Sequence, residues 1–274
     1  MNNDDQKTIR IAILDLNEGR PNQGMRCIHQ IIDEWEMNSE VRVDREVFDV
    51  RVKNELPDTS FDIYISSGGP GDPISTRYED WDINWNKWVD EMLRWNDNPS
   101  NKQKKYVFFI CHSFQLASRF FNAGILRQRH STAFGVFPVH MLDDAKDEPV
   151  FDGLHDPFYA VDSRDYQLVH PNSDVLKKMG AKILCIEKER PHVPFERAVM
   201  GIRFNEYMIG TQFHPEADPI GMTHHLQTPE KRNTVIENYG EEKLRNMLDH
   251  LGDPDKIMLT YSHVLPNFLN QAVA

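Results

Sequence analysis

The stretch KKYVFFICHSFQLASRFFNAG, residues 104–124, predicts a buried strand that turns into a helix at Cys111. Residues 106–110 form a wholly apolar run of aromatic and β-branched residues, which is typical of a strand buried on both faces. From His112 onward the apolar residues recur at helical spacing, and Gly124 is a typical helix stop. The free N–H groups at the start of a helix favour a thiolate, so the pattern indicates a nucleophilic cysteine. The alternative is a small buried hydrophobe at a strand end.

The segments around this stretch predict an open α/β sheet rather than a sandwich. Residues 9–16 are an almost continuous apolar run, and an amphipathic helix is expected over about 22–35. Two further strands are expected over 41–50 and 61–66. Segments with β character follow at 133–141, 158–161, 182–187, 198–204 and 207–213, with a hairpin around Asn205 and Glu206. Strands and helices that enter in this order favour the α/β class.

Helical patterns lie on both sides of these segments. Four tryptophans at helical spacing predict a helix over roughly 82–95 in which they form the core face. Two more amphipathic helices are expected over 229–250 and 254–271. The simplest organisation is one α/β domain over residues 1–218, with a helical extension over 219–274 packed on the same domain.

Composition excludes several classes of function. The net charge of −12 and the pI near 5.4 argue against nucleic acid or an anionic membrane as partner. Three cysteines without a CxxC spacing indicate neither a disulfide framework nor a zinc site, and they fit a reducing compartment. The N-terminal residues lack the apolar core of a signal peptide, and no apolar run reaches the roughly 20 residues that span a bilayer. We expect a cytoplasmic protein without metal or cofactor.

Two further motifs follow predicted strands. Residues 66–73 (SSGGPGDP), here called the glycine turn, can expose backbone N–H groups because glycine adopts φ values closed to other residues. His214 lies at a strand end, and Glu216 is close enough to orient its imidazole. Each motif alone has a simpler structural explanation, a tight loop or a structural histidine. Together with Cys111 they supply what acyl transfer by cysteine requires: oxyanion donors, a nucleophile and an oriented base.

The chain resembles class I, triad-type glutamine amidotransferase domains over roughly residues 9–218. GGPGDP at 68–73 is similar to the family's oxyanion turn, and TQFHPE at 211–216 is similar to its His/Glu motif. Cys111 and Gln115 match the nucleophile and a glutamine-contacting position. The resemblance implies an open, mostly parallel, flavodoxin-like central sheet with helices on both faces.

The resemblance also implies roles for individual residues. Cys111 would attack the carboxamide carbon of glutamine, His214 would carry the proton to ammonia, and Glu216 would orient His214. The backbone N–H groups of Gly69 and His112 would stabilise the oxyanion. A γ-glutamyl thioester would form, and water would hydrolyse it to glutamate.

The implied substrate site and partner complete the hypothesis. The expected substrate-binding residues are Gly68, Gln115, Ser163, Arg164 and Asp165, of which the last two would engage the α-carboxylate and α-amino groups. The chain carries no synthetase motif, so a separate acceptor subunit would use the ammonia. The sequence leaves homo-oligomerisation open.

Two positions depart from the family pattern and keep alternatives open. The family has glycine two residues before and two residues after the nucleophile, where this chain has Phe109 and Ser113. Phe109 could close space beside Cys111, and Ser113 could strain the turn. The alternatives are another Cys-His-Glu acyl-transfer enzyme, such as a γ-glutamyl hydrolase or peptidase or a homoserine acyltransferase-like enzyme, and a catalytically inactive regulatory homologue.

Overall fold

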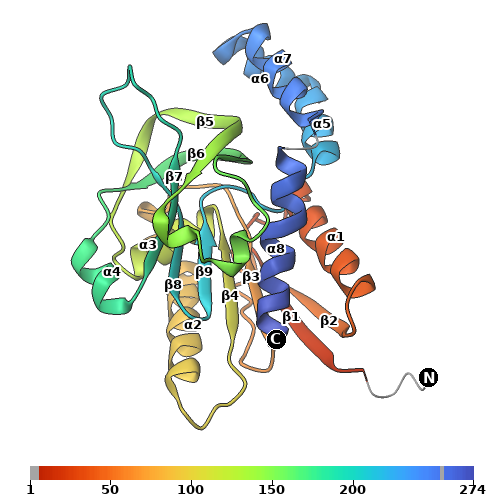
Figure 1. The fold of residues 1–274 in the computed structure, drawn as a ribbon, viewed down its shortest axis with the longest axis vertical. Coiled ribbons are helices and arrows are strands. Elements are labelled where there is room, and N and C mark those ends of the chain that lie inside the picture. The colour runs from red at the N-terminus through yellow and green to blue at the C-terminus, as the bar shows by residue number, and fades with distance from the viewer. Residues whose placement is uncertain (1–5, 254–255) are drawn as a thin grey trace.

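A nine-stranded sheet organises the protein in the computed structural model, which describes residues 6–253 and 256–274 (Figure 1). The strands are β1 Thr8–Asp15, β2 Arg42–Asp49, β3 Ile63–Ser66, β4 Tyr106–Ile110, β5 Ile125–Met141, β6 Phe158–Val169, β7 Lys182–Glu187, β8 Val199–Asn205 and β9 Met208–Thr211. Their order across the sheet is β2-β1-β3-β4-β9-β8-β7-β5-β6.

The sheet has a parallel half and an antiparallel half. Strands β2, β1, β3, β4 and β9 run parallel, while β9, β8, β7, β5 and β6 pair in antiparallel fashion. The expected α/β class is confirmed, and so is the hairpin around Asn205 and Glu206, which joins β8 to β9. The predicted parallel arrangement is found in the half of the sheet that carries Cys111, and the other half is antiparallel.

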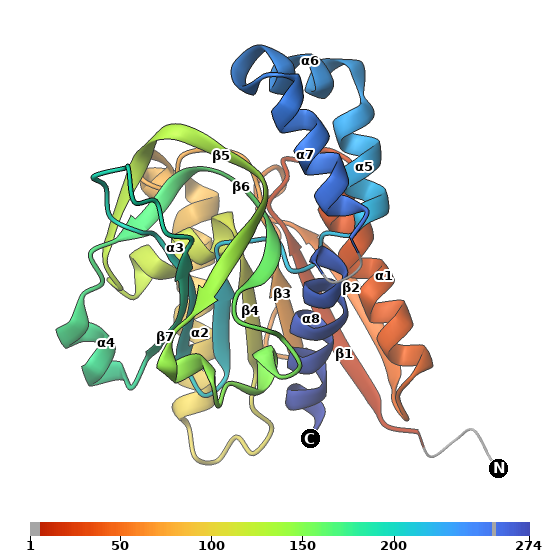
Figure 2. The same ribbon diagram turned by 45° about the horizontal axis from the view of Figure 1, so that its top comes forward.

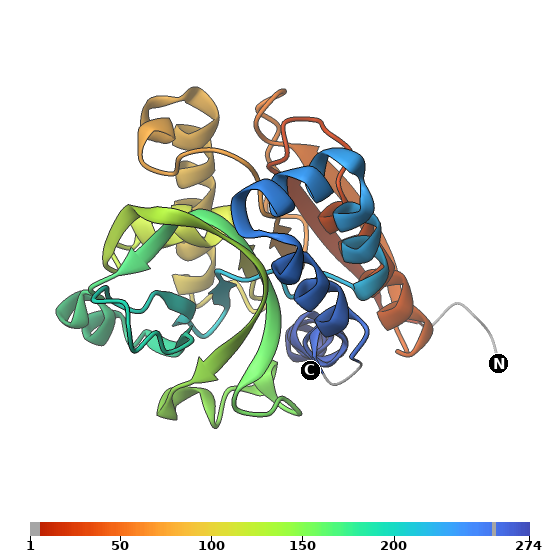
Figure 3. The same ribbon diagram turned by 90° about the horizontal axis from the view of Figure 1, so that it is seen from above.

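Helices cover both faces of the parallel half, as expected (Figures 1 and 3). Helices α1 Gln23–Met37 and α8 Ile257–Val273 share one core with Ile11 and Ile13. Helices α2 Asp80–Asp97 and α3 His112–Phe120 share the opposite core with Ala12 and Leu14. Alternate residues of β1 therefore enter different cores, which explains its almost continuous apolar sequence. The short helices between the strands are α4 Ser173–Met179, η1 Ser75–Tyr78, η2 Asp143–Ala145 and η3 Pro149–Phe151.

Three of the four tryptophans of α2 pack in the core, as their spacing predicts, whereas Trp95 is half-buried and its Nε1 donates to the Gln103 carbonyl at 2.9 Å. Trp81, Trp85 and Trp88 are buried, and Trp85 contacts Phe109 with ring centroids 5.6 Å apart. Helix α2 is longer at both ends than the predicted 82–95. The aromatic stripe therefore anchors the helix beside β4.

The C-terminal part forms four helices rather than two. They are α5 Pro219–Gln227, α6 Pro229–Tyr239, α7 Glu241–Leu251 and α8. The single helix predicted over 229–250 is wrong because Gly240, at φ 84°, separates α6 from α7. Within residues 6–253 and 256–274, no helix is both long enough and apolar enough to cross a membrane.

These C-terminal helices pack in two places (Figure 2). Helices α5–α7 lie beside β5 and β6, where Leu226 and Leu244 share a cluster with Val136 and Val161. Helix α8 lies against α1, and Trp35 Nε1 donates to Asn270 Oδ1 at 2.8 Å.

Strand β6 crosses over the carboxyl ends of the parallel strands. Val161 forms an isolated antiparallel bridge with His214, whose N–H donates to the Val161 carbonyl at 2.9 Å. Figures 2 and 3 show the β5–β6 pair arching over the sheet. Ligands of open α/β sheets bind outside the carboxyl ends of the strands, which is the region that β6 covers.

Candidate active site

Cys111 lies on a sharp turn between β4 and α3, where the sequence predicts a strand–helix junction. Its backbone adopts φ 49° and ψ −99°, a strained conformation for a residue with a side chain. Its N–H donates to the Thr211 carbonyl at 2.7 Å, and its own carbonyl accepts from the Gln115 N–H at 3.1 Å. These bonds hold the turn from both sides. They present Sγ to a cavity at the carboxyl edge of the sheet.

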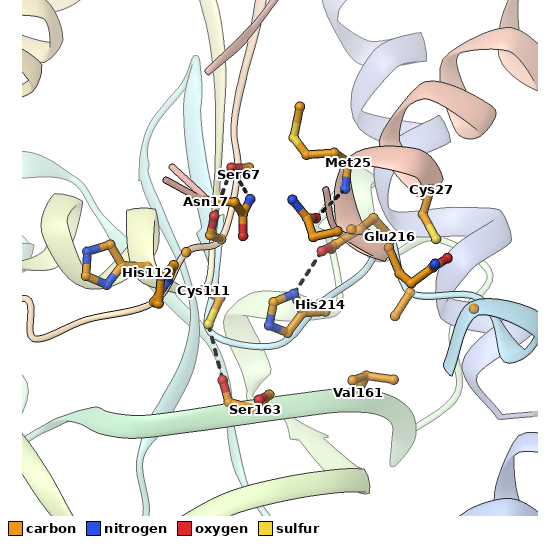
Figure 4. A pocket seen from close by; sticks show the side chains of 18 of the residues that line it. Asn17, Met25, Cys27, Ser67, Cys111, His112, Val161, Ser163, His214 and Glu216 are labelled. Carbon is orange, nitrogen blue, oxygen red and sulfur yellow. Dashed lines mark hydrogen bonds and ion pairs between the residues drawn. The ribbon is translucent and has the colours of Figure 1, made fainter. Parts of the chain in front are cut away.

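His214 and Glu216 lie across this cavity from the turn (Figure 4). His214 Nδ1 is 2.8 Å from Glu216 Oε1. Burial alone would lower the pKa of His214, but the neighbouring Glu216 carboxylate and Cys111 sulfur together raise this pKa well above its usual value. The imidazole therefore lies between the carboxylate and the cysteine, in the order that the sequence predicts.

The raised pKa of His214 makes stability depend on pH. Protonated His214 stabilises the folded state fully below the unfolded-state pKa of about 6.5, and this contribution is lost as pH rises through the higher folded-state pKa. Above pH 6.5 we expect the free energy of unfolding to fall with a slope up to about 1.4 kcal/mol per pH unit steeper than in a His214→Asn variant. Urea unfolding of both proteins from pH 6 to 9 measures the difference, and equal slopes would contradict it.

His112 has a different environment from His214. Its ring is buried against Trp81, with ring centroids 6.4 Å apart. Burial, and then the charges of Arg51 and Arg119, lower the pKa of His112 to about 3. The ring is therefore neutral, so His112 is suited to contribute its backbone N–H rather than a base.

The glycine turn packs closely against its surroundings. A Cβ added at Gly69 would lie 2.4 Å from the Leu16 carbonyl oxygen, which leaves no room for a side chain. A Cβ at Gly68 would lie 3.0 Å from His214 Cε1 and 3.5 Å from Cys111 Cβ. Both glycines line the cavity together with Cys111. The absence of side chains lets the backbone of the turn approach the cysteine and histidine.

The two departures from the family pattern have separate structural explanations. Phe109 points away from the cavity into the core on the α2 side, where it contacts Trp85 and Phe204. Ser113 lies within α3, so its backbone is helical and does not strain the turn. Its hydroxyl donates to the Ser67 carbonyl at 2.6 Å and is 2.8 Å from Ser66 Oγ. Ser113 therefore ties α3 to the glycine turn.

The hydrogen bonds of Ser113 to the glycine turn should contribute to the free energy of unfolding. We expect Ser113→Ala to lower the free energy of unfolding by about 1–3 kcal/mol, because it removes the hydrogen bond that the buried carbonyl of Ser67 accepts from Ser113. Ser118→Ala is the matched control on the same helix, since Ser118 Oγ is buried and has no hydrogen-bond partner among the described residues. Urea unfolding should show a change within about 0.5 kcal/mol for the control. Equal losses in both variants would contradict the tie.

The other predicted substrate residues surround the cysteine. Gln115 Nε2 donates to the Tyr166 carbonyl at 3.1 Å and to Gln212 Oε1 at 3.0 Å. Cys111 Sγ is 3.6 Å from the Ser163 carbonyl. Ser163, Arg164 and Asp165 line the cavity.

Arg164 has its charge engaged elsewhere. Its guanidinium is buried, 3.0 Å from Asp162 and 3.2 Å from Glu187. The expected binding of an α-carboxylate by Arg164 and of an α-amino group by Asp165 stays a prediction.

The cavity itself has a volume of about 970 Å³. Its walls come from the start of α1, the glycine turn, β6 and α5, and Met25, Phe134, Val161 and Met222 supply apolar surface. In the part of the chain that the structure describes, no group of three or more His, Cys, Asp and Glu side chains could hold a metal ion.

Gly24 supports the site and was not predicted from the sequence. It lies in the first turn of α1, and a Cβ added there would be 3.1 Å from Glu216 Oε1. The positive end of the helix dipole thus faces the carboxylate that orients His214. The one sequence signal that could have indicated Gly24 was the predicted start of this helix near Asn22. The side chain of Asn22 does cap α1.

Comparisons with solved structures agree with this fold. The protein SMU.1228c has a TM-score of 0.67 at 18% identity, covering 97% of this chain and 100% of its own. A glutamine amidotransferase from Thermotoga maritima has a TM-score of 0.66 at 15% identity, covering 97% and 98%. The glutaminase domain of Trypanosoma brucei CTPS, with bound acivicin, has a TM-score of 0.57 at 15% identity, covering 97% and 94%. At these identities the likeness establishes the fold.

The family assignment comes from the sequence. A comparison with curated proteins gives no match. A family model described as glutamine amidotransferase class-I matches residues 27–228, which is well over half of the chain. The resemblance carried by the glycine turn and by Thr211–Glu216 is thereby confirmed, and the chain belongs to the class-I glutamine amidotransferase family.

Proposed function

We propose that this protein hydrolyses the side-chain amide of glutamine through a γ-glutamyl thioester on Cys111. The observation that carries the proposal is the convergence of Cys111, His214 and Glu216 in one cavity, with the imidazole 2.8 Å from the carboxylate. A positioned nucleophile, base and orienting group are the requirements of acyl transfer by cysteine.

The proposed reaction has two stages. The Cys111 thiolate attacks the amide carbon, and the N–H groups of Gly69 and His112 stabilise the oxyanion. The C–N bond breaks as protonated His214 donates its proton to the leaving ammonia. Water then attacks the thioester, with His214 accepting its proton, and glutamate leaves as the thiol is restored. Glu216 holds the imidazole in the tautomer that both stages need.

A direct test incubates the purified protein with glutamine and measures ammonia release together with the intact mass. We expect ammonia and a transient adduct on Cys111 that is absent from a Cys111→Ala variant. A glutamine-like electrophile should label the same residue. Neither ammonia nor label, with or without candidate acceptor proteins, would overturn the proposal.

The glycine turn allows a second test. Gly69→Ala must displace the turn, because its Cβ would lie 2.4 Å from the Leu16 carbonyl oxygen. The displacement moves the Gly69 N–H, so we expect kcat for glutamine hydrolysis to fall by about 10²–10³-fold. Gly252→Ala is the control, since its Cβ would approach nothing closer than 3.6 Å. Steady-state kinetics measures both, and an unchanged kcat in Gly69→Ala would remove Gly69 from the oxyanion site.

The ammonia acceptor in this proposal is a separate synthetase-type subunit. The Trypanosoma brucei neighbour is the glutaminase domain of CTPS, which motivates a search for such a partner. The three free cysteines fit a protein that works in the reducing cytoplasm.

The size of the cavity favours one second candidate, the hydrolysis of γ-glutamyl amides with an apolar substituent. A volume of about 970 Å³ exceeds what glutamine alone needs, and Phe134 and Met222 supply apolar surface. A higher kcat/KM for an N-alkyl γ-glutamyl amide than for glutamine would favour this candidate. The reverse order would favour glutamine.

A further inference from the structure

A second cavity lies behind β6, on the side away from Cys111. Its volume is about 410 Å³, and Arg129, Asp162, Glu187, Lys188 and Arg190 are among the residues that line it. Because successive side chains of a strand point to opposite faces, Asp162 lines this cavity while Ser163 lines the cavity that holds Cys111. The two cavities therefore share one strand as a wall.

Three arginines converge on a single carboxylate here. Arg129 Nη1, Arg164 Nη2 and Arg190 Nη2 lie 3.3, 3.2 and 3.0 Å from the oxygens of Glu187. The other carboxylate is Asp162, which Arg164 Nε contacts at 3.0 Å. Three guanidinium groups thus face two carboxylates, and Lys188 adds a further cation at the wall.

The hydrogen-bonding capacity of this cluster is not used up. Among the described residues, Arg190 Nε and Arg164 Nη1 are buried without a hydrogen-bond partner, and so is Asp162 Oδ1. Arg164 is itself almost fully buried, with 1% of its side chain exposed. Buried donors without partners cost free energy, and a buried excess of positive charge costs more.

The excess of positive charge in this cluster is increased by the environment of Asp162. Burial raises the pKa of this carboxyl, although the neighbouring arginines Arg164 and Arg129 oppose the shift. Part of the negative charge that would balance the arginines is therefore disfavoured. A purely structural ion-pair network would be expected to balance its charges and satisfy its donors.

We propose that this second cavity binds a small molecule through a phosphate or carboxylate group, with Arg129 and Arg190, which both line it, as its ligands. Guanidinium groups present planar pairs of N–H donors that match such oxyanions, and the orphaned donors are of this kind. The volume exceeds that of an inorganic anion, so the rest of the molecule extends toward the rim. There His130 and Phe195 stack with ring centroids 4.3 Å apart.

Thermal unfolding and calorimetric titration with inorganic phosphate, and separately with citrate, test the site at constant ionic strength. We expect at least one anion to raise Tm of the wild-type protein by about 3 °C at ten times its Kd. Arg190→Gln should weaken its binding at least about 10-fold. Arg45→Gln, which removes the same charge on β2 at the opposite edge of the sheet, should bind as the wild type does.

The two probes also distinguish the ligand class. Binding of phosphate identifies a phosphoryl ligand, and binding of citrate alone identifies a carboxylate. If Arg190→Gln does not fold, Arg129→Gln replaces it with the same expectation. The proposal is overturned if neither anion binds the wild-type protein, or if the arginine variants of the cavity bind as tightly as Arg45→Gln. Binding is measured without turnover, so the result is independent of the glutaminase proposal.

Discussion

Replacing Cys111 by alanine is expected to lower kcat for glutamine hydrolysis by about 10⁴–10⁶-fold, the range seen when the nucleophile of a comparable site is removed. The thiol is the group that forms the covalent intermediate, and no other cysteine can take its place. Cys27 lines the cavity, but burial raises its pKa to about 12, which suppresses the thiolate. Ammonia release under saturating glutamine measures the loss.

The control for this experiment is Cys185→Ala. Cys185 is fully buried in β7, and it does not line the cavity that holds Cys111. We expect this variant to keep the wild-type kcat. Substantial ammonia release by a folded Cys111→Ala variant would refute the thioester route.

Glu216→Gln is expected to lower kcat by about 10³–10⁴-fold while leaving the fold intact. The amide can still hydrogen-bond to His214, but it no longer attracts a proton to the imidazole. The pKa of His214, which burial opposes and the Glu216 and Cys111 partners raise, should therefore fall. NMR titration of the His214 ring nitrogens measures this pKa directly, beside kcat from steady-state kinetics.

Glu34→Gln is the matched control for that substitution. Glu34 accepts a hydrogen bond from Tyr261 at 3.2 Å on the α1–α8 side, away from His214. Neither kcat nor the His214 titration should change in this variant. An unchanged kcat in Glu216→Gln would mean that the imidazole needs no carboxylate to orient it.

The cysteine, histidine and glutamate were predictable because each depends on local sequence. Apolar residues before Cys111 and helical spacing after it define the turn, and His214 with Glu216 lies within one short motif. The parallel half of the sheet was predictable for the same reason, since strands buried on both faces are continuous apolar runs.

What the sequence did not reveal depends on contacts between distant segments. The approach of Gly24 to Glu216 joins residues almost two hundred positions apart, and no local pattern encodes it. The engagement of Arg164 by Glu187 follows from the antiparallel pairing of β5 with β6 and β7. The role of Ser113 was also hidden, because its partners Ser66 and Ser67 lie on another strand and its turn.

At Cys111 the residue that the backbone angles favour differs from the residue that the proposed chemistry needs. A non-glycine residue at φ 49° costs the folded state on the order of 1–3 kcal/mol. Glycine would suit this backbone best, yet glycine has no thiol. Replacing Cys111 by glycine should therefore raise the free energy of unfolding while removing the nucleophile. A related protein that no longer needed catalysis would gain stability from this substitution. This chain keeps a cysteine at a position where the backbone favours glycine.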